Sequence, residues 1–268
     1  MKKPILSFDL DMTLLDHKTW EIPRSALCAI EQLRPYCRLV IATGRNLDDI
    51  LGVPYQKQLC PDAVIHLNGS RITVGGTEIF HHFIAPEKVS SLISFAMQHD
   101  ICLGAHVGEH DYFTHPEHLE TLDRERFGES IRNFASAELL PSLSVHSMVF
   151  VGEDAKRKLL ETQFPDFQFF PFAGGMMADI SESGISKASG MQRLAAFWGN
   201  TMDDVVAFGD SMNDYELLLM AGTGVAMGNA CEELKTIADY VTTDIDKDGV
   251  LHACQSLRLL EHWSHIGT

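Results

Sequence analysis

The chain has 268 residues, of which 45% are hydrophobic and 22% are charged, and its formal net charge at pH 7 is -16. This length is enough for a full hydrophobic core and is near the size at which one core divides into two domains. The negative charge argues against non-specific binding to nucleic acid or to an anionic membrane, because their phosphates would be repelled. We therefore expect neither a nucleic-acid partner nor a membrane partner.

The cysteine pattern and the start of the chain indicate a cytoplasmic protein. The six cysteines are widely spaced and include no Cys-x-x-Cys pair, so we expect free thiols in a reducing compartment. Asp9 and Asp11 interrupt the apolar run that a signal peptide would need after the first lysines. No apolar run approaches the roughly 18 residues that span a bilayer.

The first chemical motif follows the first predicted strand. Residues 4–8 are an apolar run typical of a strand that is buried on both faces of a parallel sheet. Asp9 and Asp11 come next, and residues two apart lie on one side of an extended chain, so the two carboxylates can face one another. Carboxylates that close repel unless a cation lies between them or one keeps a proton. The pair suits a divalent-metal site with a nucleophile and an acid/base, although Asp-x-Asp alone is also typical of an acidic turn.

Helices and strands alternate over the next stretch of the chain. Apolar spacing predicts a helix over residues 23–33, a buried strand over 38–42, a helix over 46–51, a strand over 63–67 and a hairpin over 72–80. Strands that alternate with helices indicate a parallel sheet with crossover helices.

The pattern changes from about His82. We predict a helix over residues 86–99, a strand-like segment over 101–113, a polar segment without periodicity to 129, a strand over 145–151, a helix over 154–163 and a strand over 167–172. This is typical of a separate α+β module with antiparallel strands. Its histidines match no zinc-binding spacing, so we interpret them as surface residues rather than metal ligands.

The α/β pattern resumes at Gly184. We predict helices over residues 186–197, 213–220, 231–237 and 249–260, and strands over 205–208, 224–227 and 240–242. The fold class is therefore α/β, with a Rossmann-like parallel-sheet core made of residues 1–82 and 184–268. An α+β domain of residues 83–183 is inserted into this core.

Polar side chains gather where the predicted strands end, and ligands of open α/β sheets bind at that edge. Besides Asp9 and Asp11, these groups are Thr43-Gly44-Arg45, Lys187, and the segment Gly209-Asp210-Ser211-Met212-Asn213-Asp214. Thr43 and Gly44, at an expected helix start, offer a hydroxyl and N–H groups to a phosphate. Lys187 lies in the first turn of its predicted helix, where the helix dipole does not favour a cation, so we expect an anion beside it.

These segments resemble the haloacid dehalogenase superfamily, and within it the Cof-type phosphatases with a type IIB cap between the second and third motifs. The resemblance extends past Asp214 through Ala221-Gly222-Thr223-Gly224-Val225-Ala226-Met227-Gly228-Asn229-Ala230, Lys235, Ala238-Asp239 and Asp248-Gly249-Val250. It implies a Mg²⁺-dependent phosphatase that acts on small phosphorylated metabolites, with sugar phosphates as the leading class. A phosphomutase of the same superfamily and a non-catalytic phosphometabolite-binding regulator are the alternatives.

The resemblance also implies roles for individual residues. Asp9 would be the nucleophile that forms an aspartyl-phosphate, and Asp11 the acid and later the base. Mg²⁺ would be held by Asp9, the backbone carbonyl of Asp11, Asp210 and Asp214. The phosphoryl group would be bound by Thr43, Gly44, Asn213 and Lys187.

The inserted domain would be the cap that excludes water and selects the substrate. Candidate substrate contacts are His106 and Asp179, with Glu109, His110, Asp111, Tyr112 and the loop of residues 174–177 as further positions. Arg45 is either a substrate contact or part of a structural ion pair. The expected partner is a small phosphate ester, and the protein is a monomer or a homodimer.

One position departs from the superfamily pattern. Met12 stands between Asp11 and Thr13, where the superfamily usually has glycine. A positive φ there would cost about 1 kcal/mol or more for methionine. Because no chemical residue is lost, we expect that the position does not need a positive φ and that Met12 simply places an apolar side chain near the cap entrance.

Overall fold

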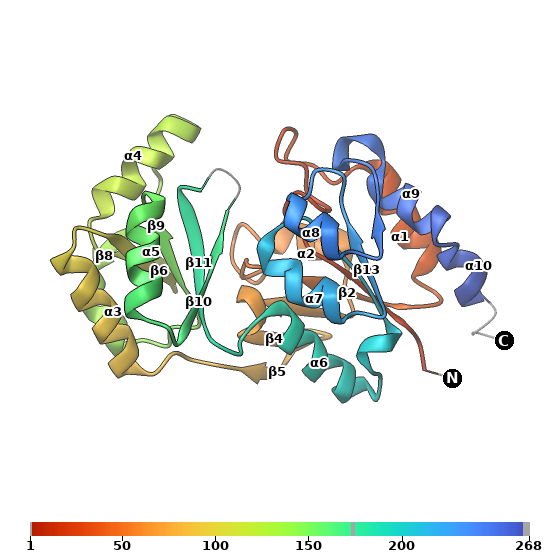
Figure 1. The fold of residues 1–268 in the computed structure, drawn as a ribbon, viewed down its shortest axis with the longest axis horizontal. Coiled ribbons are helices and arrows are strands. Elements are labelled where there is room, and N and C mark those ends of the chain that lie inside the picture. The colour runs from red at the N-terminus through yellow and green to blue at the C-terminus, as the bar shows by residue number, and fades with distance from the viewer. Residues whose placement is uncertain (1, 173–174, 265–268) are drawn as a thin grey trace. The chain divides into compact units, whose positions relative to one another are not determined.

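The computed structural model describes residues 2–172 and 175–264 (Figure 1). The chain forms two compact units, of which the first combines Met1–Phe80 with Ile185–Thr268 and the second is His81–Gly184. Each unit has its own cluster of buried apolar side chains. Within the described ranges, no helix is both long enough and apolar enough to cross a membrane.

The first unit is built on an eight-stranded sheet in the order β14-β13-β12-β1-β2-β3-β4-β5. Its strands are β1 (Ile5–Phe8), β2 (Arg38–Ala42), β3 (Ala63–His66), β4 (Arg71–Val74), β5 (Thr77–His81), β12 (Val205–Gly209), β13 (Thr223–Ala226) and β14 (Tyr240–Val241). Pairing is parallel from β14 through β3, and β4 is antiparallel to β3. The predicted parallel-sheet core is confirmed, and β1 lies at its topological switch point between β2 and β12.

Two groups of helices flank this sheet. The helices of the unit are α1 (Arg24–Leu33), α2 (Val53–Leu59), α6 (Lys187–Trp198), α7 (Tyr215–Met220), α8 (Glu232–Ile237), α9 (Gly249–Ser256) and α10 (Leu259–Ser264). Helix α1 contacts α9 and α10, whereas α7 contacts α6 and α8. In Figure 1 the first group lies on one side of the labelled strands β2 and β13, and α7 and α8 lie on the other.

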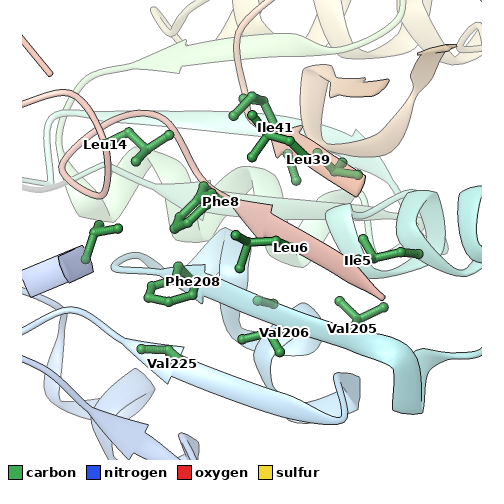
Figure 2. Packing of buried hydrophobic residues seen from close by; sticks show 14 of the residues in the cluster. Ile5, Leu6, Phe8, Leu14, Leu39, Ile41, Val205, Val206, Phe208 and Val225 are labelled. Carbon is green, nitrogen blue, oxygen red and sulfur yellow. The ribbon is translucent and has the colours of Figure 1, made fainter. Parts of the chain in front are cut away.

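Strand β1 is buried on both faces, as its mostly apolar sequence predicts (Figure 2). Phe8 pairs with Phe208 of β12, and their rings are 4.6 Å apart between centroids. On the other side Phe8 is in register with Ile41 of β2. Burying one such side chain stabilises the fold by roughly 1.5–3 kcal/mol. The strand that ends at the first chemical motif is therefore firmly fixed in the core.

The second unit contains a six-stranded sheet in the order β10-β11-β9-β6-β7-β8. Its strands are β6 (Cys102–Val107), β7 (His110–Phe113), β8 (Phe134–Ser136), β9 (Met148–Val151), β10 (Phe167–Pro171) and β11 (Met177–Glu182), and its helices are α3 (Pro86–Gln98), α4 (Pro116–Phe127) and α5 (Asp154–Gln163). All its neighbouring strands are antiparallel except β7 and β8, which are parallel. This is the expected α+β arrangement.

Several predicted elements were wrong. The helix expected over residues 46–51 is a loop, because the Asp49 carboxylate accepts hydrogen bonds from Leu51 and Gly52 and turns the chain before α2 begins at Val53. Residues 101–113 form two strands joined at Gly108, and residues 116–127, predicted to lack structure, form α4. The loop expected around residue 177 is strand β11, while Gly174 lies outside the described residues. The closing helix is interrupted at Arg258, whose φ is 50°.

Candidate active site

Asp9 lies directly after β1, at the centre of the sheet edge. Its backbone N–H donates to the carbonyl of Phe208 at 3.0 Å, which continues the pairing with β12. The side chain is buried, with 5% of the residue exposed. The central strand therefore delivers one carboxylate into the interior at a fixed place.

The loop after β12 delivers two more carboxylates. The Asp214 Oδ2 accepts hydrogen bonds from the backbone N–H groups of Asp210 and Ser211, at 3.1 and 3.2 Å. A Cβ on Gly209 would lie 2.4 Å from the Asp214 Cγ, so only glycine leaves room for this carboxylate. Asp210 in turn accepts from the hydroxyls of Thr13 and Ser211, at 3.1 and 2.9 Å. Both carboxylates are thus oriented by groups next to them.

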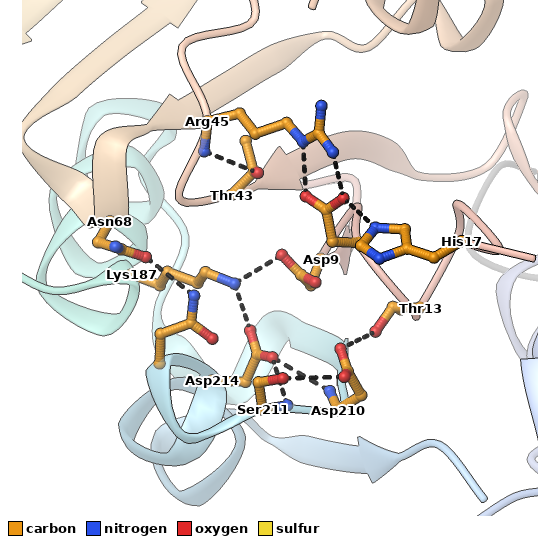
Figure 3. Close-up of polar contacts among 12 residues, drawn as sticks. Asp9, Thr13, His17, Thr43, Arg45, Asn68, Lys187, Asp210, Ser211 and Asp214 are labelled. Carbon is orange, nitrogen blue, oxygen red and sulfur yellow. Dashed lines mark hydrogen bonds and ion pairs between the residues drawn. The ribbon is translucent and has the colours of Figure 1, made fainter. Parts of the chain in front are cut away.

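Lys187 is the first residue of α6 and so lies in the first turn of this helix, as predicted. The N-terminus of α6 lies close to the backbone at Gly69, which follows β3. A Cβ on Gly69 would lie only 2.1 Å from the Ser186 carbonyl oxygen. The Lys187 side chain is fully buried, and its Nζ donates to Asp9 Oδ1 at 2.6 Å and to Asp214 Oδ1 at 2.7 Å (Figure 3). The anion expected beside this lysine is, in this structure, a pair of aspartates.

Burial and charge together shift the pKa values of these groups. Burial, opposed by Lys187 and assisted by neighbouring carboxylates, raises the pKa of Asp9 well above its usual value. Burial and the charge of Asp214 raise the pKa of Asp210 to about 7. Burial alone would lower the pKa of Lys187, but Asp214 and Asp9 outweigh it and hold that pKa above its usual value. The lysine therefore stays charged, and the carboxylates attract further positive charge.

The cluster of Asp9, Asp210 and Asp214 fits a divalent cation. One oxygen from each of the three carboxylates lies within 4.8 Å of the others, and all three residues are buried. When all three carboxylates are ionised, the one ammonium of Lys187 leaves two of their negative charges uncompensated. Hard oxygen ligands are also the donors that Mg²⁺ and similar cations prefer. Among the described residues, this is the one group of side chains with metal-binding geometry.

The Asp11 carboxylate does not join that of Asp9, although the spacing of the two residues predicts this, but bonds to Arg45 and His17. The carboxylate accepts from Arg45 Nε at 2.7 Å, Arg45 Nη2 at 2.6 Å and His17 Nε2 at 2.6 Å. The dashes that start at the labelled Arg45 guanidinium and His17 ring in Figure 3 mark these contacts. It does not belong to the Asp9 cluster, because the chain leaves the extended conformation after Asp9 and alternation no longer holds. Burial raises the pKa of Asp11, but the bonds from His17 and Arg45 outweigh it and lower that pKa to about 2.

The predicted phosphate contacts Thr43 and Asn213 lie in different loops, Thr43 after β2 and Asn213 after β12. Thr43 is buried at the end of β2, and its hydroxyl accepts from the Arg45 N–H at 3.1 Å. Thr43 and Gly44 do not begin a helix, so the expectation of a helix N-terminus here was wrong. Asn213 Nδ2 donates to Asn68 Oδ1 at 3.0 Å. Asn68 was not predicted, although its place after β3 was a signal for it.

The expectation for Met12 was also wrong. Its φ is 60°, in the left-handed region. The turn is held on both sides, because the Met12 N–H donates to the Leu15 carbonyl at 2.9 Å and the Met12 carbonyl accepts from Asn229 Nδ2 at 2.8 Å. For a residue with a Cβ, this conformation costs roughly 1–2 kcal/mol. Methionine is therefore strained at the position where the superfamily that the sequence resembles usually has glycine.

The predicted cap contacts belong to the second unit. His106 lies on β6 and its Nδ1 is 3.3 Å from Asp111 Oδ1, while Arg132 also donates to that carboxylate, at 3.1 Å. Asp179 is buried on β11, and β9 separates it from β6 in the sheet. The structure thus does not bring His106 and Asp179 together.

A family profile described as haloacid dehalogenase-like hydrolase matches residues 6–254, which include every residue of the Asp9 cluster. The chain belongs to this family. The HMP-PP phosphatase of Klebsiella pneumoniae is 30% identical over 97% of this chain and 95% of its own length. The putative phosphatase YkrA of Bacillus subtilis is 28% identical over 97% of this chain and 100% of its own length.

Solved structures of family members share the fold. The subclass IIB sugar phosphatase BT4131 has a TM-score of 0.86 and 26% identity, and the alignment covers 96% of this chain and 100% of the other. BT1666 from Bacteroides thetaiotaomicron has a TM-score of 0.88 at 23% identity, with 96% of both chains covered. The predicted family and enzyme class are confirmed, and the chain is a phosphatase. Phosphatases of this family generally use a divalent metal ion.

Proposed function

We propose that the chain is a Mg²⁺-dependent phosphatase that hydrolyses small phosphorylated metabolites, with sugar phosphates as the leading class, through a phosphorylated Asp9. The observation that carries this proposal is the buried cluster of Asp9, Asp210 and Asp214 around Lys187. A nucleophile, metal ligands and a fixed cation are what phosphoryl transfer needs, since its catalysis is mainly positioning and charge stabilisation.

In the proposed first half-reaction, an Asp9 oxygen attacks phosphorus and the bond from phosphorus to the leaving oxygen breaks. Asp11 gives its proton to that oxygen, so the alcohol departs neutral. Asp11 is held as a carboxylate in the structure. A bound phosphate dianion places negative charge near it, which raises its pKa toward the protonated form that this step uses.

In the second half-reaction, Asp11 as carboxylate takes a proton from water while the water oxygen attacks phosphorus. The bond between phosphorus and Asp9 then breaks, which restores the Asp9 carboxylate and releases inorganic phosphate. Lys187, Thr43, Gly44 and Asn213 are the proposed contacts of the transferring group.

Mg²⁺ would be held by Asp9, Asp210, Asp214 and the backbone carbonyl of Asp11, and when bound it supplies charge neutralisation for the phosphoryl oxygens. The relatives support a small-metabolite substrate, because one is named a sugar phosphatase and others act on HMP-PP or a phosphoribitylaminouracil. We also propose that the inserted unit is the cap that sets substrate preference, with His106 and Asp179 as its candidate substrate contacts.

The test is phosphate release from a panel of hexose phosphates, pentose phosphates, nucleotides, pyridoxal phosphate and flavin mononucleotide. Each is measured with Mg²⁺, with chelator and with the Asp9→Asn variant. We expect release that needs Mg²⁺ and disappears in the variant. Metal-dependent phosphorylation of Asp9 without net release of phosphate would instead favour a phosphomutase.

A further inference from the structure

His17 lies in a tightly closed loop that follows the first chemical motif. The Asp16 N–H donates to the Glu21 carbonyl at 3.1 Å, and the Trp20 N–H donates to the Asp16 carbonyl at 2.7 Å. Lys18 Nζ ties the same loop to Asp246 at 2.7 Å. The His17 ring stacks on Trp20, with 4.7 Å between centroids and 18° between planes. The imidazole is therefore held in place by its loop and by the indole.

The bond from His17 decides which part of the Asp11 carboxylate is available. An ionised carboxylate only accepts hydrogen bonds, and its two oxygens offer about four lone-pair positions. Arg45 uses one position on each oxygen, through Nη2 to Oδ1 and Nε to Oδ2. His17 Nε2 uses a second position on Oδ1. One position remains, and it is on Oδ2.

We propose that His17 is a positioning residue that makes Asp11 Oδ2 the oxygen that exchanges protons with the substrate. This inference rests on the proposed acid/base role of Asp11. With His17 and Arg45 both in place, the carboxyl plane is fixed at three points and a proton carried by Asp11 resides on Oδ2. In the first half-reaction that proton passes to the leaving oxygen as the bond between it and phosphorus breaks.

Loss of the His17 bond leaves Arg45 as the only side-chain donor to Asp11 among the described residues, and one position on each Asp11 oxygen is then free. A proton can then reside on either oxygen, so the oxygen that serves the leaving group is no longer fixed. The effect is confined to substrates whose leaving group needs a proton. Alkyl phosphates need one because an alkoxide is a poor leaving group, whereas p-nitrophenolate leaves without one.

The test compares His17→Phe, which retains an aromatic ring to stack on Trp20 but has no donor, with His17→Gln, which retains a donor. Both are measured as kcat/KM, which reports steps through the transfer to Asp9, on an alkyl phosphate accepted by the wild type and on p-nitrophenyl phosphate. We expect His17→Phe to lose about tenfold on the alkyl ester, part of the roughly 100-fold or more that general acid catalysis supplies. On p-nitrophenyl phosphate the loss should be less than about twofold, and His17→Gln should recover most of the alkyl activity.

His17 has 39% of its side chain exposed, so these changes are compatible with folding, and the unfolding temperature of each variant checks this. His17→Ala serves as a second variant without a donor. Equal losses on both esters would reduce His17 to a structural role, and an unchanged alkyl rate in His17→Phe would overturn the proposal directly. A wild type that releases phosphate from neither ester would instead overturn the proposed function on which the inference rests.

Discussion

The buried side chains around Lys187 carry more negative than positive charge when their carboxylates are ionised. One ammonium faces the three carboxylates of Asp9, Asp210 and Asp214, all with little exposure to water. Removing one partner from a buried ion pair typically costs several kcal/mol, because the remaining charge is left without compensation. Stability and metal binding should therefore be tightly linked at this site.

The raised pKa of Asp210 predicts an unusual dependence of stability on pH. Between about pH 4 and pH 7 the folded protein without metal binds more protons than the unfolded chain, because the Asp210 pKa is about 7 when folded and near 3.8 when unfolded. The free energy of unfolding should therefore fall as pH rises through this window. Asp9, whose pKa is also raised, acts in the same direction.

Thermal unfolding in chelator from pH 5 to pH 8 measures this effect, and we expect the unfolding temperature to decrease. Added Mg²⁺ should restore stability more at pH 8 than at pH 5, since protons compete for the same carboxylates. The Asp210→Asn variant should show a shallower decrease. A slope of equal size in that variant would assign the effect to other groups.

The left-handed conformation of Met12 predicts that glycine is favoured there. Met12→Gly should be more stable than Met12→Ala by roughly 0.5–1 kcal/mol, which is the strain of an L-residue less the extra unfolded-state entropy of glycine. The comparison with alanine matters because both variants remove the same side-chain packing. Urea unfolding measures the difference, and equal stabilities would show that the turn relaxes when the side chain is removed.

At the level of elements, short strands and the loops after them set the active-site geometry. Strand β12 ends at Gly209, and the following loop folds back so that the Asp214 side chain lies against that glycine. The adjacent strand β13 contains Gly224, where an added Cβ would lie 2.4 Å from the Leu218 carbonyl oxygen. An added Cβ would meet a neighbouring atom at the same distance at both glycines. At Gly209 that atom belongs to a proposed metal ligand, whereas at Gly224 it belongs to the backbone.

This pair allows a controlled experiment. Gly209→Ala should displace the Asp214 carboxylate and weaken Mg²⁺ binding by at least about tenfold, the effect of losing about 1.4 kcal/mol. Gly224→Ala should lower stability through its backbone contact but leave Mg²⁺ affinity nearly unchanged. Isothermal titration calorimetry and thermal unfolding separate the two effects. Equal losses of affinity in both variants would contradict the specific role of Gly209.

Elements were predictable where sequence pattern and burial coincide. The strands β1, β2 and β12 are mostly apolar and buried, and the capping serine before Lys187 marks the start of α6. Helix α4 was missed because its residues are mostly polar, although Pro116 at its start and Gly128 after its end were available signals. The loop over residues 46–52 was missed because its conformation depends on how one carboxylate, Asp49, bonds to the backbone.

In the active site, too, some features were predictable from the sequence and others were not. Its residues were predictable because strand ends meet at one edge of a parallel sheet, whichever side-chain rotamers they adopt. The partners of Asp11 were not, since they depend on where the turn at Met12 directs the chain. His17 was missed for a related reason. It is eight residues from Asp9 and belongs to no strand end, so only the closed loop brings it to Asp11.

At the level of the whole molecule, each of the two units has its own core, and every member of the metal-binding cluster lies in the first. Hydrogen exchange should show this separation. Because a ligand stabilises the states that bind it, Mg²⁺ should slow exchange in peptides from residues 2–80 and 185–264. Peptides from residues 86–163 should change much less. Equal slowing in both sets would indicate that the units open together.

The discontinuous first unit also constrains how the protein is made. Strand β1 is synthesised before the second unit, yet its neighbour β12 begins at Val205, after the whole second unit has been synthesised. Until then β1, which is buried on both faces in the folded protein, can pair only on its β2 side. The second unit can therefore be complete before β12 exists, so the strand that carries Asp9 lacks one of its two neighbours throughout the synthesis of that unit. Nascent chains arrested before residue 205 should therefore be the species that most need a chaperone.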